Sequence, residues 1–289
     1  MSTKEERTFG GQTLVAPLRR VLVRSPDPVA MRRWREYGWI AEPDPAIASE
    51  QHEALCEILQ DAGAEVLLAT ADVASDPDAV YVCDPAIMSD LGAVVLRPGK
   101  QARRVESSAA ARDFRALGVP VAFEMSEPAT AEGGDTMWLD ERTLLVGRSY
   151  RTNDAGIGAL RDALPGVEVL AFDLPRLKGP DACLHLLSLL SPIDDDLVVA
   201  YVPLMPIRLL ELLADRDIAI VEVPDDEFDS MGPNVLALAP RVVLAVDGNP
   251  DTARRMERAG VDVTVYEGSD ISHKGEGGPT CLTRPVLRA

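Results

Sequence analysis

One pattern of apolar segments recurs along this 289-residue chain and limits the folds that it can adopt. In each copy, two apolar segments joined by a short turn precede a helical segment, and a third apolar segment follows the helix. Four complete copies begin with hairpins at residues 80–97, 136–147, 184–201 and 235–246. Repetition of one supersecondary unit indicates an architecture built from copies of that unit. The sequence therefore predicts four similar ββαβ units.

The helix and the last strand of each unit are predicted from periodicity and boundary residues. In the last helix, Asn249 is expected as the N-cap, Pro250 occupies the first position and Gly260 follows the end. The other helices are expected at residues 105–117, 154–164 and 207–213. The strands that follow the four helices are expected at residues 119–123, 167–172, 218–223 and 261–266.

A fifth unit is split between the two ends of the chain. Residues 281–287 can pair with residues 13–23, and a helix near residues 50–60 and a strand at residues 64–69 follow. A doubly wound sheet, the alternative, needs mostly parallel strands, whereas each tight hairpin here requires an antiparallel pair. Pairing the ends closes a ring and removes exposed strand edges. We therefore predict one domain, residues 1–289, with the α/β class of a five-bladed α/β propeller.

Composition and charge exclude several classes of function. The chain is 46% hydrophobic and has no apolar run of the ~18 residues that a membrane span needs. Its first residues lack the apolar segment of a secretory signal, so a cytoplasmic location is expected. A formal charge of −18 repels phosphate backbones and anionic lipids, so neither nucleic acid nor membrane is an expected partner. The same charge attracts a cationic small molecule, although an acidic surface also simply keeps a protein soluble.

The cysteines are too few and too scattered for a disulfide framework. They stand at positions 56, 83, 183 and 281, and no Cys-x-x-Cys or Cys/His cluster suggests a zinc site. We therefore expect free thiols and no bound metal. Cys281 follows Gly277-Gly278-Pro279, and a loop without bulky side chains lets a thiol approach a substrate closely. The alternative is that Cys281 is a small buried hydrophobic residue.

Histidine is the usual proton carrier near neutral pH, and the chain has three. His185 is the first choice because it lies near the first strand of a hairpin, although a histidine among leucines is often a core residue. His273, in the loop before Cys281, is the second choice. His52 is expected on an exposed helix face.

Carboxylates stand at related places in other units. Asp84 and the pair Glu132 and Asp135, separated by two glycines, lie near the first strand of their hairpins, as His185 and Cys281 do. Equivalent positions in a ring of units face a common axis, so these side chains are expected to converge on one site. Carboxylates there can hold a planar cation and orient a histidine. The alternative is that Glu132 and Asp135 only cap a turn.

Taken together, these residues resemble the guanidine-modifying, or pentein, superfamily over nearly the whole chain. This superfamily includes arginine deiminases, amidinotransferases and dimethylarginine dimethylaminohydrolases. The resemblance rests on residues 78–84, 97–106, 132–135, 151–153, 184–186 and 277–281. Because Leu186-Leu187-Ser188 follow His185, the chain looks most like the dimethylarginine dimethylaminohydrolase branch.

The resemblance implies roles for individual residues. Cys281, His185 and Glu132 would be catalytic, and Asp84 and Glu132 would hold the guanidinium. The remaining residues implied to bind substrate are Asp78 at the α-amine, Arg103 and Arg151 at the carboxylate, Asp135, and Glu276 as a further acid near the guanidinium.

This chain departs from the branch in two places. Cys83 stands where the pattern has Glu, which removes one negative charge and leaves more room for a substituted nitrogen, unless its side chain points away. The Gly-Gly-Pro approach to Cys281 looks more like the deiminases.

The activity implied is hydrolysis of a guanidine carbon–nitrogen bond in a small arginine derivative, such as an N-omega-methylated arginine. Citrulline and an amine would form through a covalent thiouronium on Cys281, with no cofactor. An amidinotransferase or an arginine deiminase-like enzyme is the alternative within this chemistry. A non-catalytic binding propeller is the alternative outside it. The resemblance also allows a homodimer.

Overall fold

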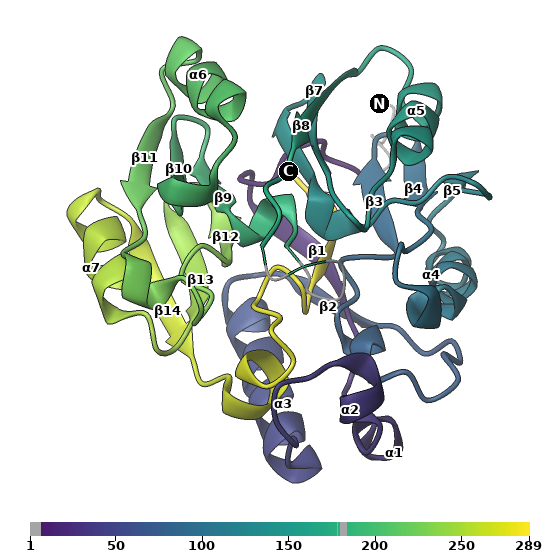
Figure 1. Ribbon diagram of the computed structural model, residues 1–289. Coiled ribbons are helices and arrows are strands. Elements are labelled where there is room, and N and C mark those ends of the chain that lie inside the picture. The colour runs from purple at the N-terminus through teal and green to yellow at the C-terminus, as the bar shows by residue number, and fades with distance from the viewer. Residues whose placement is uncertain (1–6, 178, 180–183) are drawn as a thin grey trace, which may run out of the picture.

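The computed structural model describes residues 7–177, 179 and 184–289. Within these residues, fifteen strands form five three-stranded sheets, which Figure 1 shows around a common centre. Four sheets are continuous in sequence: β3 (Ala86–Ser89), β4 (Gly92–Val95) and β5 (Val121–Glu124); β6 (Thr136–Asp140), β7 (Thr143–Arg148) and β8 (Glu168–Asp173); β9 (Leu190–Asp194), β10 (Leu197–Ala200) and β11 (Ala219–Glu222); β12 (Val235–Ala239), β13 (Val242–Val246) and β14 (Asp262–Tyr266).

Every sheet has the same mixed order. The first strand of each hairpin pairs antiparallel with the second, and the strand after the helix pairs parallel with the second, as β6, β7 and β8 do. The helices that make these crossovers are α3 (Pro45–Asp61), α4 (Val105–Ala116), α5 (Asp154–Ala163), α6 (Ile207–Asp215) and α7 (Pro250–Arg258). The predicted ββαβ units are confirmed, and each sheet with its helix forms one blade of the α/β propeller.

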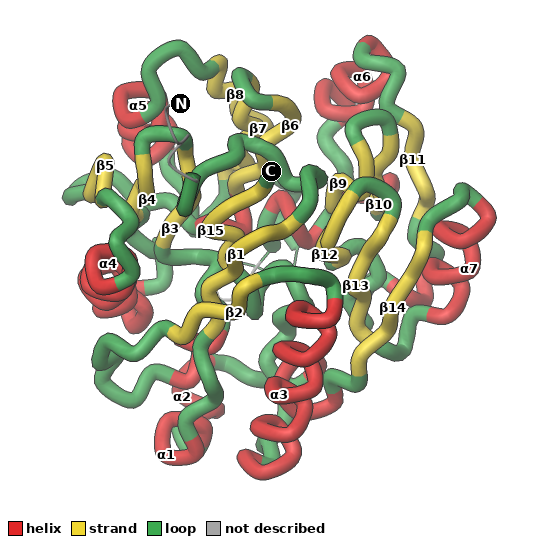
Figure 2. Tube along the Cα trace, turned by 180° about the vertical axis from the view of Figure 1, so that it is seen from behind, coloured by secondary structure: helices red, strands yellow, loops and turns green. Residues whose placement is uncertain are grey.

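The fifth sheet joins the two ends of the chain, as predicted. It contains β15 (Arg284–Arg288), β1 (Leu18–Val23) and β2 (Glu65–Leu68), and Figure 2 shows β15 beside β1. β1 pairs antiparallel with β15, with Leu18 opposite Arg288 and Leu22 opposite Arg284, and pairs parallel with β2. Residues of this sheet pack on α3, as Val21 and Leu55 do in one core cluster.

The helix boundaries follow local signals. α7 begins at Pro250 and ends before Gly260, whose φ of 81° is left-handed. Asn249 is its N-cap, but the side chain that accepts hydrogen bonds from the first helical N–H groups is Glu227. α3 begins at Pro45, earlier than expected, because the Asp44 side chain accepts hydrogen bonds from two N–H groups of the first turn. Two short helices, α1 (Pro28–Met31) and α2 (Trp34–Tyr37), were not predicted.

The expectation of an exposed His52 was wrong. Its side chain is only 3% exposed, because α3 packs along residues 269–273 and buries the face that carries Gln51 and His52. Burial lowers the pKa of His52 to about 4, so the ring is neutral near neutral pH.

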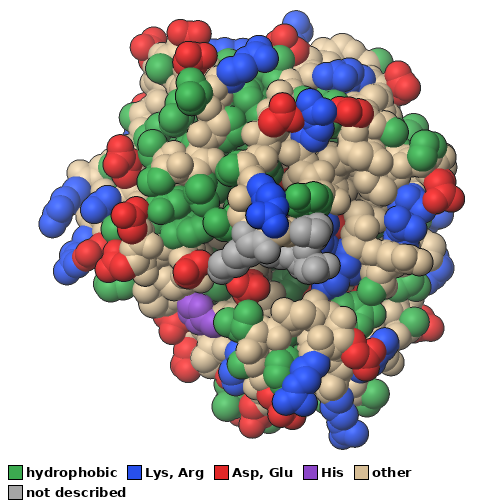
Figure 3. All heavy atoms as spheres, in the orientation of Figure 1, with side chains coloured by type: hydrophobic (Ala, Val, Ile, Leu, Met, Phe, Trp, Pro, Cys, Tyr) green, Lys and Arg blue, Asp and Glu red, His purple; other side chains and the backbone are tan. Residues whose placement is uncertain are grey.

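Three of the four cysteines lie in the described part of the chain, and all three are free thiols. They are Cys56, Cys83 and Cys281, whereas Cys183 lies outside the described residues. Among the described helices, none combines the length and the apolar character that crossing a bilayer requires. Acidic and basic side chains are interspersed over the face shown in Figure 3.

Candidate active site

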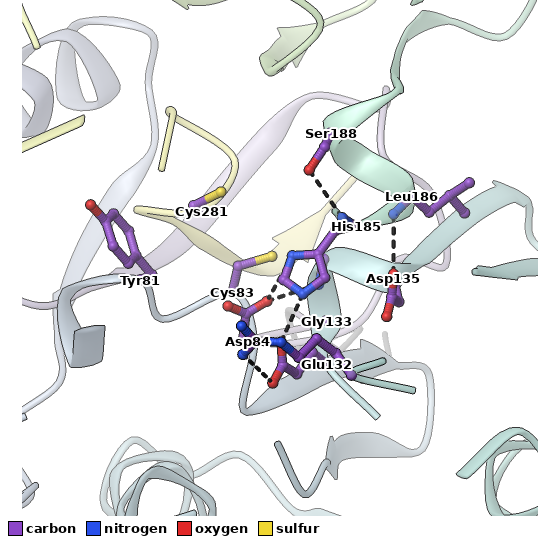
Figure 4. Close-up of polar contacts among 12 residues, drawn as sticks. Tyr81, Cys83, Asp84, Glu132, Gly133, Asp135, His185, Leu186, Ser188 and Cys281 are labelled. Atoms are coloured by element: carbon purple, nitrogen blue, oxygen red, sulfur yellow. Dashed lines mark hydrogen bonds and ion pairs between the residues drawn. The ribbon is translucent and has the colours of Figure 1, made fainter. Parts of the chain in front are cut away.

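The predicted site residues come from the segments that lead into the first strand of each sheet. Asp84 precedes β3, Glu132 precedes β6, His185 precedes β9 and Cys281 precedes β15. Figure 4 shows these side chains gathered in one region, although they come from four different blades. The convergence expected from the repeat is therefore what the structure has.

His185 and Glu132 form the central contact. Nε2 of His185 lies 2.7 Å from Oε2 of Glu132, and the two side chains are 7% and 0% exposed. Burial alone would raise the pKa of the Glu132 carboxyl. The hydrogen bond and charge of His185, followed by the charges of Arg151 and Arg103, outweigh burial and hold that pKa well below its usual range. Glu132 is therefore a permanent anion that fixes one ring nitrogen of His185.

Asp84 lies on the other side of the imidazole. Its Oδ1 is 3.9 Å from Nδ1 of His185 and accepts a hydrogen bond from the Gly134 amide at 3.0 Å. A Cβ on Gly134 would lie 2.2 Å from Nδ1 of His185, so only glycine lets the ring sit against this loop. The glycines between Glu132 and Asp135 thus allow close packing of backbone and imidazole.

Asp135 holds the backbone on which His185 sits. Its Oδ1 accepts a hydrogen bond from the Leu186 amide at 3.1 Å, and its Oδ2 accepts hydrogen bonds from the hydroxyls of Ser149 and Thr152 at 2.6 and 2.7 Å. Burial raises the pKa of Asp135 to about 6 despite these donors and the nearby His185. Asp135 therefore positions the loop of His185, and both of its oxygens have protein partners.

The Cys281 thiol is held by a residue that the sequence analysis missed. Nδ2 of Asn234 lies 3.3 Å from Sγ of Cys281, and Oδ1 of Asn234 accepts hydrogen bonds from the amide and hydroxyl of Thr280. Asn234 directly precedes β12, so the blade of β12, β13 and β14, the one not yet represented, also contributes a residue at the equivalent place. The position of Asn234 at the start of a hairpin, equivalent to the positions of the predicted site residues, is the sequence feature that could have identified it.

The environment of Cys281 opposes ionisation. Burial, followed by the charge of Asp84 and the neighbouring Cys83, raises the pKa of the Cys281 thiol to about 12, against the smaller opposing effects of Asn234 and His185. The thiol is therefore protonated in the unliganded protein at neutral pH. A cation placed beside it would favour the thiolate.

Arg103 is bound by protein groups rather than presented to the site. It is 4% exposed and donates from Nε to Glu106 at 2.6 Å, from Nη1 to Asp84 at 2.5 Å, and from Nη2 to Glu106 and the carbonyls of Asp78 and Tyr81. All three of its nitrogens are engaged. The expected contact with a substrate carboxylate does not match this arrangement, because the acids around Arg103 already use its donors.

Asp78 also has two close side-chain partners, besides Arg103, whose Nε lies 3.9 Å from Oδ2 of Asp78. Its Oδ1 accepts a hydrogen bond from the indole of Trp39 at 2.8 Å, and its Oδ2 forms an ion pair with Lys100 at 2.6 Å. The backbone amide of Lys100 in turn donates to Glu132 at 3.1 Å. The carboxylate expected at an α-amine is thus paired with an ammonium group of the protein.

Arg151 and Glu276 lie in different surroundings. Nη1 of Arg151 is 3.6 Å from Oε1 of Glu132, and Arg151 also lines a cavity of about 190 Å³ with Arg148 and Tyr150. Arg151 therefore connects the His185–Glu132 pair with an open space. Glu276 is exposed, with a left-handed φ of 59°, and no hydrogen bond or ion pair among the described residues joins it to the other site residues.

Cys83 is buried beside Arg284. Its Sγ accepts a hydrogen bond from Nη2 of Arg284 at 2.7 Å, and burial raises the pKa of the Cys83 thiol despite this contact. Cys83 and Arg284 line a second cavity that neither Cys281 nor His185 lines.

A family model decides the class of protein to which this site belongs. Residues 40–288 match the model described as N,N dimethylarginine dimethylhydrolase, eukaryotic. The chain belongs to the dimethylarginine dimethylaminohydrolase family. A dimethylarginine dimethylaminohydrolase of Streptomyces coelicolor is 30% identical over 270 residues, covering 92% of this chain and 96% of that protein. The Pseudomonas aeruginosa dimethylarginine dimethylaminohydrolase is 27% identical over 244 residues, covering 84% of this chain and 90% of that protein.

Solved structures agree on the fold of the family. The Pseudomonas aeruginosa dimethylarginine dimethylaminohydrolase, as a cysteine-to-serine mutant complexed with citrulline, superimposes with a TM-score of 0.76 at 24% identity, covering 93% of this chain and 99% of that one. An arginine deiminase of Listeria welshimeri is also related, at 27% identity over 256 residues, although this chain spans only 62% of its length.

The side chains of this site would have to move apart to bind a metal ion. Asp84, Glu132 and His185 each offer a ligand atom, and these atoms lie within 4.8 Å of one another. Two atoms bound tetrahedrally to one zinc at ~2.0–2.2 Å lie roughly 3.3 Å or more apart. The 2.7 Å contact between His185 and Glu132 is instead a hydrogen bond, and an ion would have to break it.

Proposed function

We propose that this chain hydrolyses the guanidine carbon–nitrogen bond of N-omega-methylated arginines and releases citrulline and an alkylamine. The observation that carries this proposal is the buried His185–Glu132 hydrogen bond, gathered with Asp84 and Cys281 from four blades. The family to which the chain belongs supports it, as do relatives named dimethylarginine dimethylaminohydrolase.

The first step is formation of a thiolate on Cys281. The pKa of about 12 keeps this thiol neutral until a guanidinium ion binds, and the bound cation then offsets the unfavourable charge of Asp84. The Asn234 amide donates to Sγ and stabilises negative charge there. The enzyme is thus activated by the charge of its own substrate.

His185 moves the protons of the reaction. The proton that Cys281 loses passes to His185 and makes it an imidazolium. The thiolate adds to the guanidinium carbon, the bond from this carbon to the alkylated nitrogen breaks, and that nitrogen takes the proton from His185 and leaves as an amine. A thiouronium remains on Cys281. His185 then removes a proton from water, which attacks the same carbon. The carbon–sulfur bond breaks as the added hydroxyl loses its proton to solvent, which gives citrulline and the thiolate. The anionic Glu132 stabilises the imidazolium formed in this step.

Substrate recognition is divided among the remaining residues. We assign Asp84 and Glu132 to the guanidinium, because both present buried carboxylate oxygens beside His185. Arg151 is assigned to the substrate carboxylate, because it adjoins the cavity of about 190 Å³. Arg103 holds Asp84 in place. Asp78 reaches an α-amine only by exchanging its ion pair with Lys100.

The test is a substrate panel of arginine, monomethylarginine, dimethylarginines, agmatine and simple guanidines, scored for ureido product and for released amine. We expect citrulline and an equal amount of methylamine or dimethylamine from the methylated arginines. Cys281→Ser is expected to fold with an unchanged Tm and to lose turnover, because a hydroxyl is far less ionised than a thiol. Turnover of arginine alone, with release of ammonia, would contradict the proposal.

A deiminase-like activity on arginine itself is the second candidate. It is favoured by the Gly277-Gly278-Pro279 approach to Cys281 and by arginine deiminase relatives such as that of Listeria welshimeri. An amidinotransferase differs from both hydrolases because an amine, instead of water, accepts the amidino group. If the chain is an amidinotransferase, adding a primary amine to the assay gives a new guanidine at the expense of citrulline.

A further inference from the structure

Two arginines are buried at the centre of the propeller without an acidic partner. Arg284 and Arg288 are 6% and 3% exposed, and both line one cavity of about 30 Å³. Nη2 of Arg284 donates to the carbonyl and thiol of Cys83 at 2.7 Å. Arg288 donates to the carbonyls of Ala16 and Ala237 at 2.6 and 2.8 Å. No carboxylate of the described residues forms an ion pair with either guanidinium.

Uncompensated charge of this kind is costly. A guanidinium stays protonated in proteins, and a buried charge without a counter-charge is strongly unfavourable. Within residues 7–177, 179 and 184–289, the only ionisable side chain that hydrogen-bonds to either guanidinium is the Cys83 thiol, and burial raises its pKa, so it remains neutral. Burial and the charge of Arg284 lower the pKa of Arg288 to about 9, which still leaves Arg288 charged at neutral pH. Two positive charges therefore line one small cavity.

The cavity also contains unused donors. The Nε atoms of both arginines are buried and have no hydrogen-bond acceptor among the described residues. The nearby hydroxyls of Thr136, Ser191 and Thr283 donate their protons to backbone carbonyls, and none of them accepts a hydrogen bond from either Nε. The volume of about 30 Å³ exceeds the ~10–15 Å³ that one water needs, but it is far too small for an organic ligand.

We propose that this cavity binds one small monovalent anion of the halide class between Arg284 and Arg288. The anion accepts hydrogen bonds from the unused Nε–H groups and compensates the charges of the two guanidinium groups. The site is separate from the proposed catalytic one, because Cys281, His185, Asp84 and Glu132 do not line the cavity. The proposal therefore stands or falls independently of the reaction that the enzyme catalyses.

Bromide tests the position of the anion directly. Crystals of the wild-type protein are soaked in sodium bromide, and anomalous scattering is measured at the bromine edge. We expect an anomalous peak between the guanidinium groups of Arg284 and Arg288. Density without anomalous signal would mean a water molecule, and it would overturn the proposal.

Thermal unfolding tests the energetic role in solution. Tm is measured at equal ionic strength in sodium chloride, sodium bromide and sodium gluconate, whose anion is too large for the cavity. At about ten times the Kd, a halide is expected to raise Tm by roughly 3 °C over gluconate. Arg288→Met is expected to lose this increment, whereas Arg258→Met, at an exposed position on α7, is expected to keep it. Equal Tm values in chloride and gluconate for the wild-type protein would refute the proposal. If Arg288→Met does not fold, the bromide soak of the wild-type crystals still tests it.

Discussion

The protonation state of Cys281 before substrate binds can be measured directly. With a pKa of about 12, roughly one thiol in 10⁵ is ionised at pH 7, against about 3% of an ordinary thiol with a pKa of ~8.5. Iodoacetamide reacts with the thiolate, so its rate follows that fraction. We therefore expect alkylation of Cys281 roughly 10³-fold slower than that of an exposed cysteine, rising about tenfold per pH unit between about pH 7 and 9 without a plateau.

A bound guanidinium should reverse this effect. A positive charge about 4 Å from the sulfur, at an effective dielectric constant of ~20, contributes about 4 kcal/mol, which lowers a pKa by about 3 units. A guanidinium inhibitor that is not turned over is therefore expected to bring the pKa of Cys281 from about 12 to ~9. The ultraviolet absorbance of the thiolate reports this change without requiring access of a reagent to the site.

The control is Cys281→Ser, which removes the signal of this thiol and leaves those of the other three cysteines. Two results would refute the reasoning. One is a plateau of alkylation near pH 7 in the unliganded protein, which would mean that the thiolate is already formed. The other is a thiolate signal that the inhibitor does not change.

Three further predictions concern residues around this site and on α3. Arg151→Met is expected to raise KM for arginine-type substrates at least tenfold and to leave agmatine nearly unaffected, whereas Arg258→Met, at an exposed position on α7, should change neither. Steady-state kinetics on both substrates checks this. Cys83→Glu puts a carboxylate beside Arg284. We therefore expect the ratio of kcat/KM between arginine and methylated arginines to stay within twofold of the wild-type ratio. A larger shift would show that Cys83 helps to select the substrate. His52 is neutral in the folded protein, and its pKa of about 4 against 6.5 unfolded means that stability falls as the pH drops from 6.5 to 4, by up to about 3 kcal/mol. His52→Leu should remove that part of the decline in urea unfolding, and an unchanged slope would contradict the burial argument.

The repeat made most of the fold predictable. Each hairpin, helix and strand has its own local signals, and α7 shows that N-cap, proline and glycine positions fix a helix within a residue. The start of α3 was missed because Asp44 and Pro45 precede the apolar periodicity on which the prediction relied. The burial of His52 depends on residues 269–273, which are distant in sequence, so no local pattern could reveal it.

The site was predictable in its members but not in their orientations. Asp84, His185 and Cys281 stand at equivalent positions in their blades, and this equivalence correctly predicts that they lie together. Asn234 stands at the equivalent position of another blade, but its amide is neither a nucleophile nor an acid, so its residue type gave no signal. The partners of Arg103 could not be foreseen, because Arg103 itself lies in a 3₁₀ turn and Asp84 in a loop before β3. Irregular segments of this kind have no fixed period from which the direction of a side chain follows.

The pairing of β1 with β15 also determines when in folding the nucleophile is placed. Leu22 and Arg284 are opposite each other but about 260 residues apart in sequence, so this contact closes a very long loop. The other four sheets close over much shorter distances and can form first. Until β15 docks, the hydrogen-bonding edge of β1 lies open to other chains. Cys281, three residues before β15, therefore reaches its partners only when the ring closes, and a partly folded chain carries the acids and histidine of the site without its thiol in place.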